Sequence, residues 1–251
     1  MRRLELDGVK IEVFDTVPEL IARAAGRLFD VLRTDPEAVI GLATGNTFIP
    51  FYDFVSANYR RAGISFEQTV VFNLDEYLGI PQDSEGSYHT YMDRNFFSKI
   101  DIRRENVHIP DSNPADPESE AENYERLIAR AGGIDMQFLG LGRNGHIGFN
   151  EPGTSFDSRT HVTELSASTM VANAAVFGNE KSMPRRAITM GIKTILDARR
   201  ITMLACGEEK SSAISETFTG GRMAEDVPST ALKLHRNATI LLDRQAAKSI
   251  L

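Results

Sequence analysis

The chain has 251 residues, of which 41% are hydrophobic and 25% charged, a composition typical of a folded globular protein rather than a disordered one. The net charge of −7 argues against a broad nucleic-acid-binding surface, and no apolar run approaches the roughly 18 residues of a membrane-spanning helix. The single cysteine, Cys206, excludes an intrachain disulfide. No apolar segment follows the basic residues near the N-terminus, so we expect no signal peptide and a cytoplasmic protein.

Segments typical of strands alternate along the chain with segments whose apolar residues have helical spacing. The predicted strands are residues 10–14, 38–43, 69–73, 134–141, 201–206 and 238–242. The predicted helices are residues 18–32, 51–62, 87–99, 121–131, 188–198 and 210–218. Apolar strands separated by helices indicate parallel βαβ units. We therefore expect one α/β domain over residues 1–251, with functional side chains in the loops at the carboxyl ends of its strands.

The first such loop contains residues 41–47, Gly-Leu-Ala-Thr-Gly-Asn-Thr, between a strand and a helix. Amides at a helix N-terminus bind phosphate, and Gly45 permits a close approach of the backbone to a ligand. The hydroxyls of Thr44 and Thr47 can donate hydrogen bonds. Helix capping without a ligand is the commoner reason for such residues, so this loop by itself leaves both interpretations open.

The next loop begins with residues 73–77, Asn-Leu-Asp-Glu-Tyr, at the end of an apolar strand. Neighbouring side chains in a strand point to opposite faces, so only one of Asp75 and Glu76 can face a given site. A desolvated Asp75 would have a raised pKa and could act as a general base. A solvated turn explains the two carboxylates equally well.

Residues 140–153 form the most glycine-rich segment, Gly-Leu-Gly-Arg-Asn-Gly-His-Ile-Gly-Phe-Asn-Glu-Pro-Gly. Its start matches the G-x-G-x-x-G pattern of dinucleotide-binding loops, which requires a helix to begin within the glycines. Gly148, Pro152 and Gly153 fall where that helix would run, and each opposes a helix interior. The pattern therefore predicts a loop and not a dinucleotide site.

This loop carries three polar side chains, Asn144, His146 and Glu151. A histidine beside a carboxylate is suited to proton transfer, although a histidine that only satisfies loop backbone groups would give the same pattern. The sequence has no HExxH motif and no Cys/His cluster with ligand spacing, so we expect no metal site.

Taken together, these segments resemble those of the glucosamine-6-phosphate deaminase family. The resemblance is nearly full length and is carried by residues 41–47, 73–79, 87–97, 144–153, 158–160, 187–191 and 234–236. It implies a Rossmann-like three-layer sandwich with a mostly parallel sheet, shared with ribose-5-phosphate isomerases and coenzyme A transferases. It also implies that no cofactor is used, and it leaves open whether the chain forms a homo-oligomer.

The resemblance implies conversion of glucosamine 6-phosphate and water to fructose 6-phosphate and ammonia. In that reaction Asp75 would move a proton from C2 to C1, and His146 would act in ring opening with support from Asn144 and Glu151. The residues that match the family's substrate contacts are Thr44, Gly45, Asn46, Thr47, Gly140 and Lys210.

Two positions depart from the family pattern: Phe48 stands where proline is common, and Ala175 stands where many members have a phosphate-binding arginine. They suggest as alternatives a related substrate such as galactosamine 6-phosphate, or a sugar-phosphate sensor without catalysis. The chain also lacks the longer C-terminal tail of the allosteric members, so we expect no allosteric activation.

Overall fold

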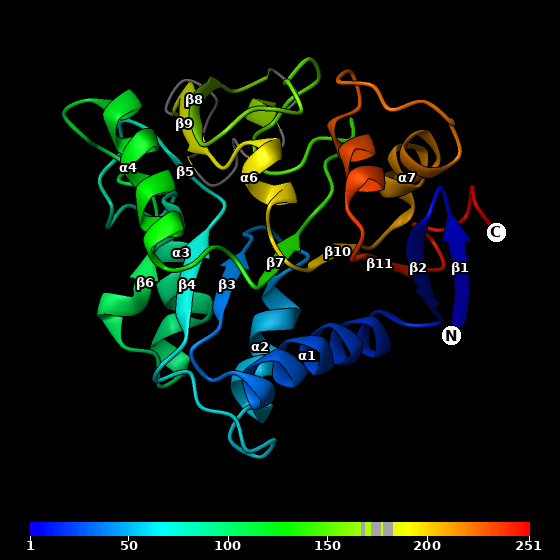
Figure 1. Cartoon of the computed structure of the whole chain (residues 1–251), viewed down its shortest axis with the longest axis horizontal. Helices are drawn as coiled ribbons and strands as arrows, with labels where there is room; N and C mark the ends of the chain where they lie inside the picture. The colour runs from blue at the N-terminus through cyan, green and yellow to red at the C-terminus, as the bar shows by residue number, and fades with distance from the viewer. Residues whose placement is uncertain (167–168, 172–176, 178–182) are drawn as a thin grey trace.

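The computed structural model describes residues 1–166, 169–171, 177 and 183–251. Its main element is an eight-stranded sheet in the order β1-β2-β11-β10-β7-β3-β4-β6 (Figure 1). The strands are β1 (Arg2–Leu6), β2 (Val9–Phe14), β3 (Val39–Leu42), β4 (Val70–Asn73), β6 (Val107–His108), β7 (Met136–Leu139), β10 (Ile201–Ala205) and β11 (Ala238–Asp243). Every neighbouring pair is parallel except the β1–β2 hairpin.

Six of these strands correspond to the strands predicted from apolar runs, whereas β1 and the two-residue β6 were not predicted. β1 has only polar and half-buried residues because it lies at the edge of the sheet, so its sequence lacks the apolar run of a central strand. The tight turn that joins it to β2 uses Asp7 and Gly8, both with positive φ.

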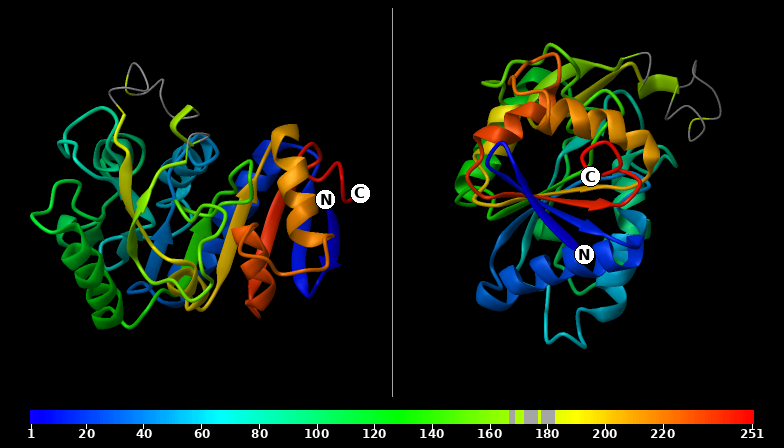
Figure 2. Two further views of the ribbon diagram at one scale, coloured as in Figure 1. Left: turned by 90° about the horizontal axis from the view of Figure 1, so that it is seen from above. Right: turned by 90° about the vertical axis from the view of Figure 1, so that its right-hand side faces the viewer.

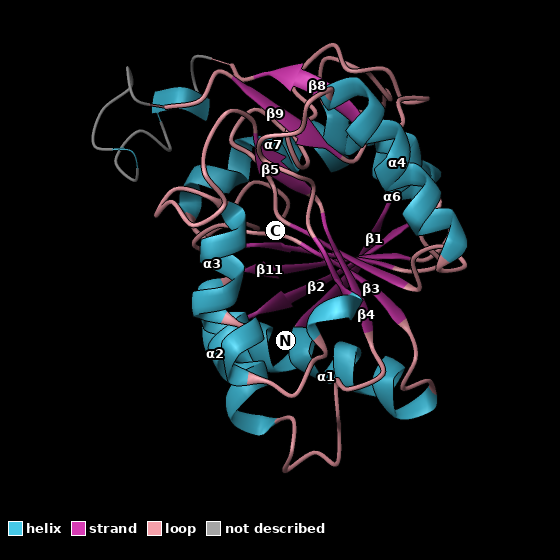
Figure 3. Ribbon diagram, turned by 90° about the vertical axis from the view of Figure 1, so that its left-hand side faces the viewer, coloured by secondary structure: helices cyan, strands magenta, loops and turns pink. Residues whose placement is uncertain are grey.

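Helices cover both faces of the sheet. They are α1 (Val17–Thr34), α2 (Ile49–Asn58), α3 (Tyr88–Asn95), α4 (Pro117–Arg130), α6 (Ile192–Leu196) and α7 (Ser211–Phe218). Figure 3 shows the sheet between α1 and α2 on one side and α4 and α6 on the other, and Figure 2 shows α7 opposite α1. The three-layer α/β sandwich predicted from the sequence is therefore confirmed.

The longest helix, α1, illustrates how the sequence defines these layers. It begins at Thr16, whose hydroxyl accepts from the amide of Glu19 while the Glu19 carboxylate accepts from the amide of Thr16. This capping box satisfies two amides that the helix itself leaves unpaired. Leu20, Ala24 and Leu28 follow at helical spacing and are completely buried against the sheet.

A second, three-stranded antiparallel sheet lies beyond one end of the large sheet (Figure 1). It consists of β5 (Asp75–Tyr77), β9 (Arg186–Thr189) and β8 (His161–Glu164), with β9 in the centre. The predicted helix over residues 188–198 is therefore wrong in its first part. The spacing of the apolar residues there fits both a helix and a strand. Residues 186–189 form a strand because β9 pairs with β5 and β8, so the helix begins only after Gly191.

The loops after β3, β4, β7 and β10 meet at one edge of the molecule. These four strands are adjacent in the order β10-β7-β3-β4 and parallel, so their carboxyl ends point the same way. This edge is where ligands bind in open α/β sheets. Ala175, where a phosphate-binding arginine was expected, lies outside the described residues. No helix in the described part of the chain is long and apolar enough to cross a membrane.

Candidate active site

Asp75 stands immediately after the end of β4 and begins β5, where it pairs with Thr189 of β9. Asp75 is only 5% exposed to solvent. Burial, together with the negative charge of neighbouring Glu76, raises the pKa of Asp75 to about 8. A buried carboxylate whose charged form is disfavoured is a strong base for its type, so an ionised Asp75 readily takes up a proton.

The loop of residues 140–153 contains no helix, and the structure describes every one of these residues. The prediction that these residues form a loop, with no helix beginning within the glycines, is thus confirmed. The loop closes on itself through a hydrogen bond from the amide of Gly142 to the carbonyl of His146, 2.9 Å long. A Cβ at Gly142 would lie 2.3 Å from the His146 ring, so the glycine leaves the space that the imidazole occupies.

His146, Asn144 and Glu151 lie together at the tip of this loop. The side-chain amide of Asn144 donates to Glu151 Oε2 at 2.8 Å, and the backbone amide of His146 donates to Asn144 Oδ1 at 3.2 Å. His146 Nδ1 lies 3.5 Å from the same Glu151 oxygen, at the outer limit of a hydrogen bond. The carboxylate therefore faces the imidazole and is oriented by the asparagine.

The other oxygen of Glu151, Oε1, accepts hydrogen bonds from two hydroxyls. Ser166 donates at 2.8 Å and Thr169 donates as well. Although burial raises the pKa of Glu151, the proximity of His146 and the hydrogen bonds from Thr169 and Asn144 outweigh it and lower the pKa to about 2. Glu151 is therefore ionised at neutral pH, with one carboxylate oxygen facing the His146 ring.

The loop after β3 exposes the groups expected to bind phosphate. Gly45 has a φ of 102°, and the side chains of Asn46 and Thr47 make no hydrogen bond to any described residue. Two tyrosines donate hydrogen bonds to the backbone of this loop. The hydroxyl of Tyr52 donates to the carbonyl of Ala43, and that of Tyr91 donates to the carbonyl of Gly45 at 2.8 Å. Two loop carbonyls are thus occupied by tyrosines.

Lys210 lies in the loop after β10, just before α7. Burial lowers the pKa of its ammonium, Glu209 counteracts this effect, and the nearby charge of Arg143 adds to it. Arg143 belongs to the 140–153 loop, so two cations from different loops converge. The sequence pattern did not single out Arg143, because an exposed arginine in a glycine-rich loop carries no signal of its own.

Phe48 does not take the place of a substrate contact. The side chain is fully buried, and its ring packs edge-on against Phe51 at a centroid distance of 5.8 Å. The ring also lies under Gly140, where an added Cβ would be 3.7 Å from it. The departure from the family pattern at this position is therefore accommodated in the core.

The structure thus places the predicted site residues in the segments that follow β3, β4, β7 and β10, at one edge of the sheet. Among the described residues, no group of three or more His, Cys, Asp or Glu side chains is arranged to hold a metal ion. Cys206 directly follows β10, but burial raises the pKa of its thiol to about 12, which makes it a poor nucleophile. The arrangement offers a buried carboxylate base, a histidine–carboxylate pair and a local group of cations and hydroxyls.

Such a site is suited to proton transfer on a small anionic ligand, and comparison with known proteins defines its family. Residues 14–241 match the family described as glucosamine-6-phosphate isomerases/6-phosphogluconolactonase. The chain belongs to this family.

Curated relatives are similar over nearly their whole length. A glucosamine-6-phosphate deaminase from Thermoanaerobacter sp. (strain X514) is 43% identical over 242 residues, 96% of this chain and 95% of the relative. Glucosamine-6-phosphate deaminase 1 from Bacillus subtilis (strain 168) is 44% identical over 239 residues, 95% of this chain and 98% of the relative.

Solved structures agree with these relationships. A monomeric glucosamine-6-phosphate deaminase superposes with a TM-score of 0.92 at 44% identity, covering 95% of this chain and 99% of its own. A 6-phosphogluconolactonase from Trypanosoma cruzi superposes with a TM-score of 0.80 at 22% identity, covering 100% of this chain and 99% of its own. The second likeness shows the common fold alone.

Proposed function

We propose that this chain is a deaminase that converts glucosamine 6-phosphate and water to fructose 6-phosphate and ammonia. The observation that carries the proposal is the buried Asp75, whose pKa of about 8 suits a base, beside the loop that holds His146 and Glu151. The deaminases to which the chain is 43–44% identical act, by their names, on the same amino-sugar phosphate.

The reaction begins with opening of the sugar ring. His146 accepts the proton of the C1 hydroxyl and returns a proton to the ring oxygen, which leaves a C1 aldehyde. Ionised Glu151 stabilises the imidazolium that exists between these two transfers, and Asn144 orients Glu151 without exchanging a proton itself.

Asp75 then removes the proton from C2, and the electron pair forms a double bond between C1 and C2. The C1 carbonyl oxygen takes up the proton that the C2 ammonium loses, which gives an enolamine. Return of a proton to C1 gives a C2 imine. Water adds to this imine, and ammonia leaves to give the C2 ketone of fructose 6-phosphate. Each step is a proton transfer or a water addition, so ordinary side-chain acids and bases are sufficient for it.

The phosphate of the substrate binds between the loops after β3 and β10 in this proposal. The backbone of Gly45 and the side chains of Thr44, Asn46 and Thr47 supply hydrogen-bond donors, Lys210 supplies positive charge, and Gly140 supplies a backbone contact. This local group of donors overrides the net charge of −7 of the whole chain. The similar solved deaminase is monomeric, and we propose that this chain likewise acts without a partner subunit, in the cytoplasm.

A substrate panel tests the proposal. The purified protein is incubated separately with glucosamine 6-phosphate, galactosamine 6-phosphate and 6-phosphogluconolactone, and ammonia, ketose phosphate and acid release are measured. We expect equal amounts of ammonia and fructose 6-phosphate from glucosamine 6-phosphate, with a higher kcat/KM than for the other two. Faster turnover of galactosamine 6-phosphate would identify that compound as the substrate instead. Binding of glucosamine 6-phosphate without turnover would indicate a sugar-phosphate sensor.

A further inference from the structure

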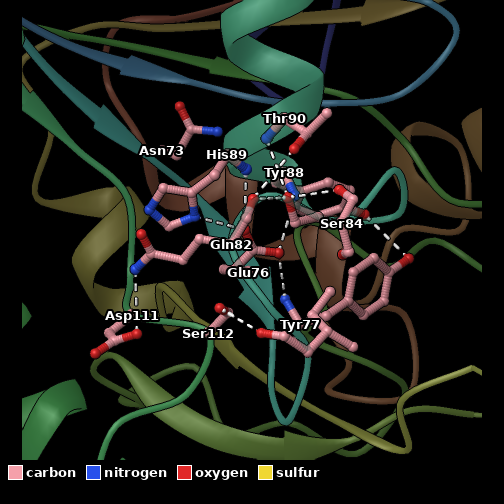
Figure 4. A network of polar contacts seen from close by, with 12 residues as sticks. Asn73, Glu76, Tyr77, Gln82, Ser84, Tyr88, His89, Thr90, Asp111 and Ser112 are labelled. Carbon is pink, nitrogen blue, oxygen red and sulfur yellow. Dashed lines mark hydrogen bonds and ion pairs between the residues drawn. The ribbon is translucent and has the colours of Figure 1, made fainter.

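Glu76 follows Asp75 in β5, and its completely buried side chain points towards the start of α3. Its Oε1 accepts from the backbone amides of Tyr77 at 2.8 Å and Tyr88 at 3.0 Å (Figure 4). Its Oε2 accepts from the backbone amide of His89 at 3.0 Å and lies 2.8 Å from His89 Nδ1. Four donors therefore converge on one carboxylate, and an ionised carboxylate can accept all four.

These contacts complete the first turn of α3. The helix has eight residues, and the hydroxyl of its N-cap, Ser87, accepts only from the amide of Thr90, at 3.0 Å. The first two amides of the helix, those of Tyr88 and His89, are left for Glu76. A negative charge at this end of a helix is favoured by the partial positive charge of the unpaired amides.

The turn that Glu76 holds supports the loop proposed to bind phosphate. Tyr91, one turn along α3, donates its hydroxyl to the carbonyl of Gly45 at 2.8 Å. Burial raises the pKa of the Tyr88 phenol and the Thr44 side chain counteracts this effect, and the Tyr88 ring stacks on Phe149 at a centroid distance of 6.0 Å. A shift of the first turn of α3 would therefore move the groups that fix Thr44 and Gly45.

The charge of Glu76 also acts on Asp75. The two carboxyls belong to adjacent residues, and both are buried. The other titratable groups that interact electrostatically with Asp75 are the phenols of Tyr52 on α2, Tyr88 on α3 and Tyr124 on α4, and burial raises the pKa of each. These phenols are neutral at ordinary pH.

The hydrogen-bond partners of Glu76 stabilise its charge without supplying a fixed cation. Among the described residues, they are three backbone amides and one imidazole, with no Lys or Arg. After burial itself, the Glu76 charge is the cause that raises the pKa of Asp75.

We propose that Glu76 is a positioning residue for the proposed reaction: its buried carboxylate fixes the first turn of α3 behind the Thr44–Gly45 backbone and places a negative charge beside Asp75. The inference rests on the proposed function for its role in turnover, whereas its electrostatic part is measurable without substrate. Glu76 itself touches neither the reacting carbons nor the phosphate.

The test follows the titration of Asp75 by carboxyl ¹³C NMR in protein labelled at aspartate, with Asp75→Asn identifying the resonance. It compares wild type with Glu76→Gln, which removes the charge, and Glu76→Asp, which keeps the charge but shortens the side chain. Glu85→Gln is the matched control, since it removes an exposed carboxylate from the same segment. We expect Glu76→Gln to lower the Asp75 midpoint by about one pH unit, with Glu76→Asp and Glu85→Gln close to wild type.

A second pair of variants keeps the test decisive if Glu76→Gln does not fold. His89 has a side chain that is 25% exposed, so His89→Lys can place a fixed positive charge beside Glu76 without removing the helix cap. We expect His89→Lys to lower the Asp75 midpoint and the uncharged variant His89→Gln to leave it unchanged. An Asp75 midpoint that is the same in wild type, Glu76→Gln and His89→Lys would overturn the electrostatic part of the inference.

The positioning part is read from the division of the effect between KM and kcat on glucosamine 6-phosphate. We expect Glu76→Asp to raise KM several-fold while kcat changes less than twofold, because the shortened side chain loosens α3 but keeps the charge. Unchanged KM in both Glu76 variants would overturn this part. If wild-type protein does not turn over the substrate, the proposed function fails, and the NMR titration still decides the effect of Glu76 on Asp75.

Discussion

Gly148 lies directly against Asp75: a Cβ on this glycine would stand 3.5 Å from Asp75 Oδ2 and 2.8 Å from Thr189 Oγ1. The glycine has a φ of 59°, in the left-handed region that other residues avoid. One residue of the loop that carries His146 thus packs on the proposed base. The contact ties the loop after β7 to the small sheet that holds Asp75.

We predict that Gly148→Ala lowers kcat by about 10- to 100-fold, because the new methyl group displaces Thr189 or the loop and moves His146 relative to Asp75. Gly153→Ala is the matched control: Gly153 belongs to the same loop and has a φ of 92°, but its added Cβ would meet no atom within 4 Å. Both variants should lose about 1 kcal/mol of stability from backbone strain. Equal kcat losses in the two variants would mean that strain, and not crowding at Asp75, causes the effect.

The raised pKa of Asp75 predicts the pH dependence of the reaction. Below a pH of about 8 the buried carboxyl is mostly protonated in the free protein and cannot take a proton from C2, so kcat/KM should rise with pH to a midpoint near 8. The ammonium of the bound substrate favours the carboxylate, so the midpoint for kcat should lie lower. Steady-state rates between pH 5 and pH 9.5 check this, and a kcat/KM midpoint near 4 would show that Asp75 is not the titrating base.

Lys210 should act in binding more than in chemistry. We predict that Lys210→Met raises KM for glucosamine 6-phosphate by about 10- to 100-fold and changes kcat much less, because in the proposed complex the ammonium contacts the phosphate in ground and transition states alike. Lys193→Met, which removes a lysine that pairs with Asp197 at the surface, is the charge control. Inorganic phosphate should also inhibit the Lys210 variant more weakly than wild type. An unchanged KM in Lys210→Met would show that the substrate phosphate does not bind at Lys210.

His146 should matter for ring opening in particular. We predict that His146→Gln slows turnover of glucosamine 6-phosphate more than turnover of an analogue whose C5 hydroxyl is methylated, since that analogue cannot close the six-membered ring. The measurement is the ratio of kcat/KM for the two compounds in wild type and variant. A ratio that does not change would assign His146 to a later step.

Much of the fold follows from the sequence because central parallel strands are buried on both faces and read as apolar runs. The six predicted strands and the edge that gathers the loops after Ala43, Asn73, Leu141 and Cys206 depend on that signal alone. The small sheet was missed because β5, β8 and β9 have three or four residues each, too few for a periodic pattern. The early start of the helix predicted over residues 188–198 has the same cause.

The sequence indicated the candidate site residues but not the contacts that they make with one another and with the residues around them. Loop glycines and polar residues at strand ends indicate where a functional site lies. The alternation of side chains along β5 predicts that Asp75 and Glu76 point to opposite faces, and Glu76 does bind the start of α3. Sequence spacing does not show that Thr169 and Glu151 meet, nor that Tyr91 reaches Gly45, because these contacts join segments that are distant in the chain. Only the three-dimensional arrangement relates them.

The central claim is that Asp75 is the base that removes the C2 proton, and Asp75→Asn tests it most directly. The amide keeps the shape of the side chain but cannot accept the proton. Ammonia and fructose 6-phosphate are measured from glucosamine 6-phosphate at pH 8, with substrate binding followed by calorimetry. We predict that wild type forms the two products in equal amounts, and that the variant binds substrate with a kcat at least about 1,000-fold lower. A variant that turns over within tenfold of wild type would contradict the account.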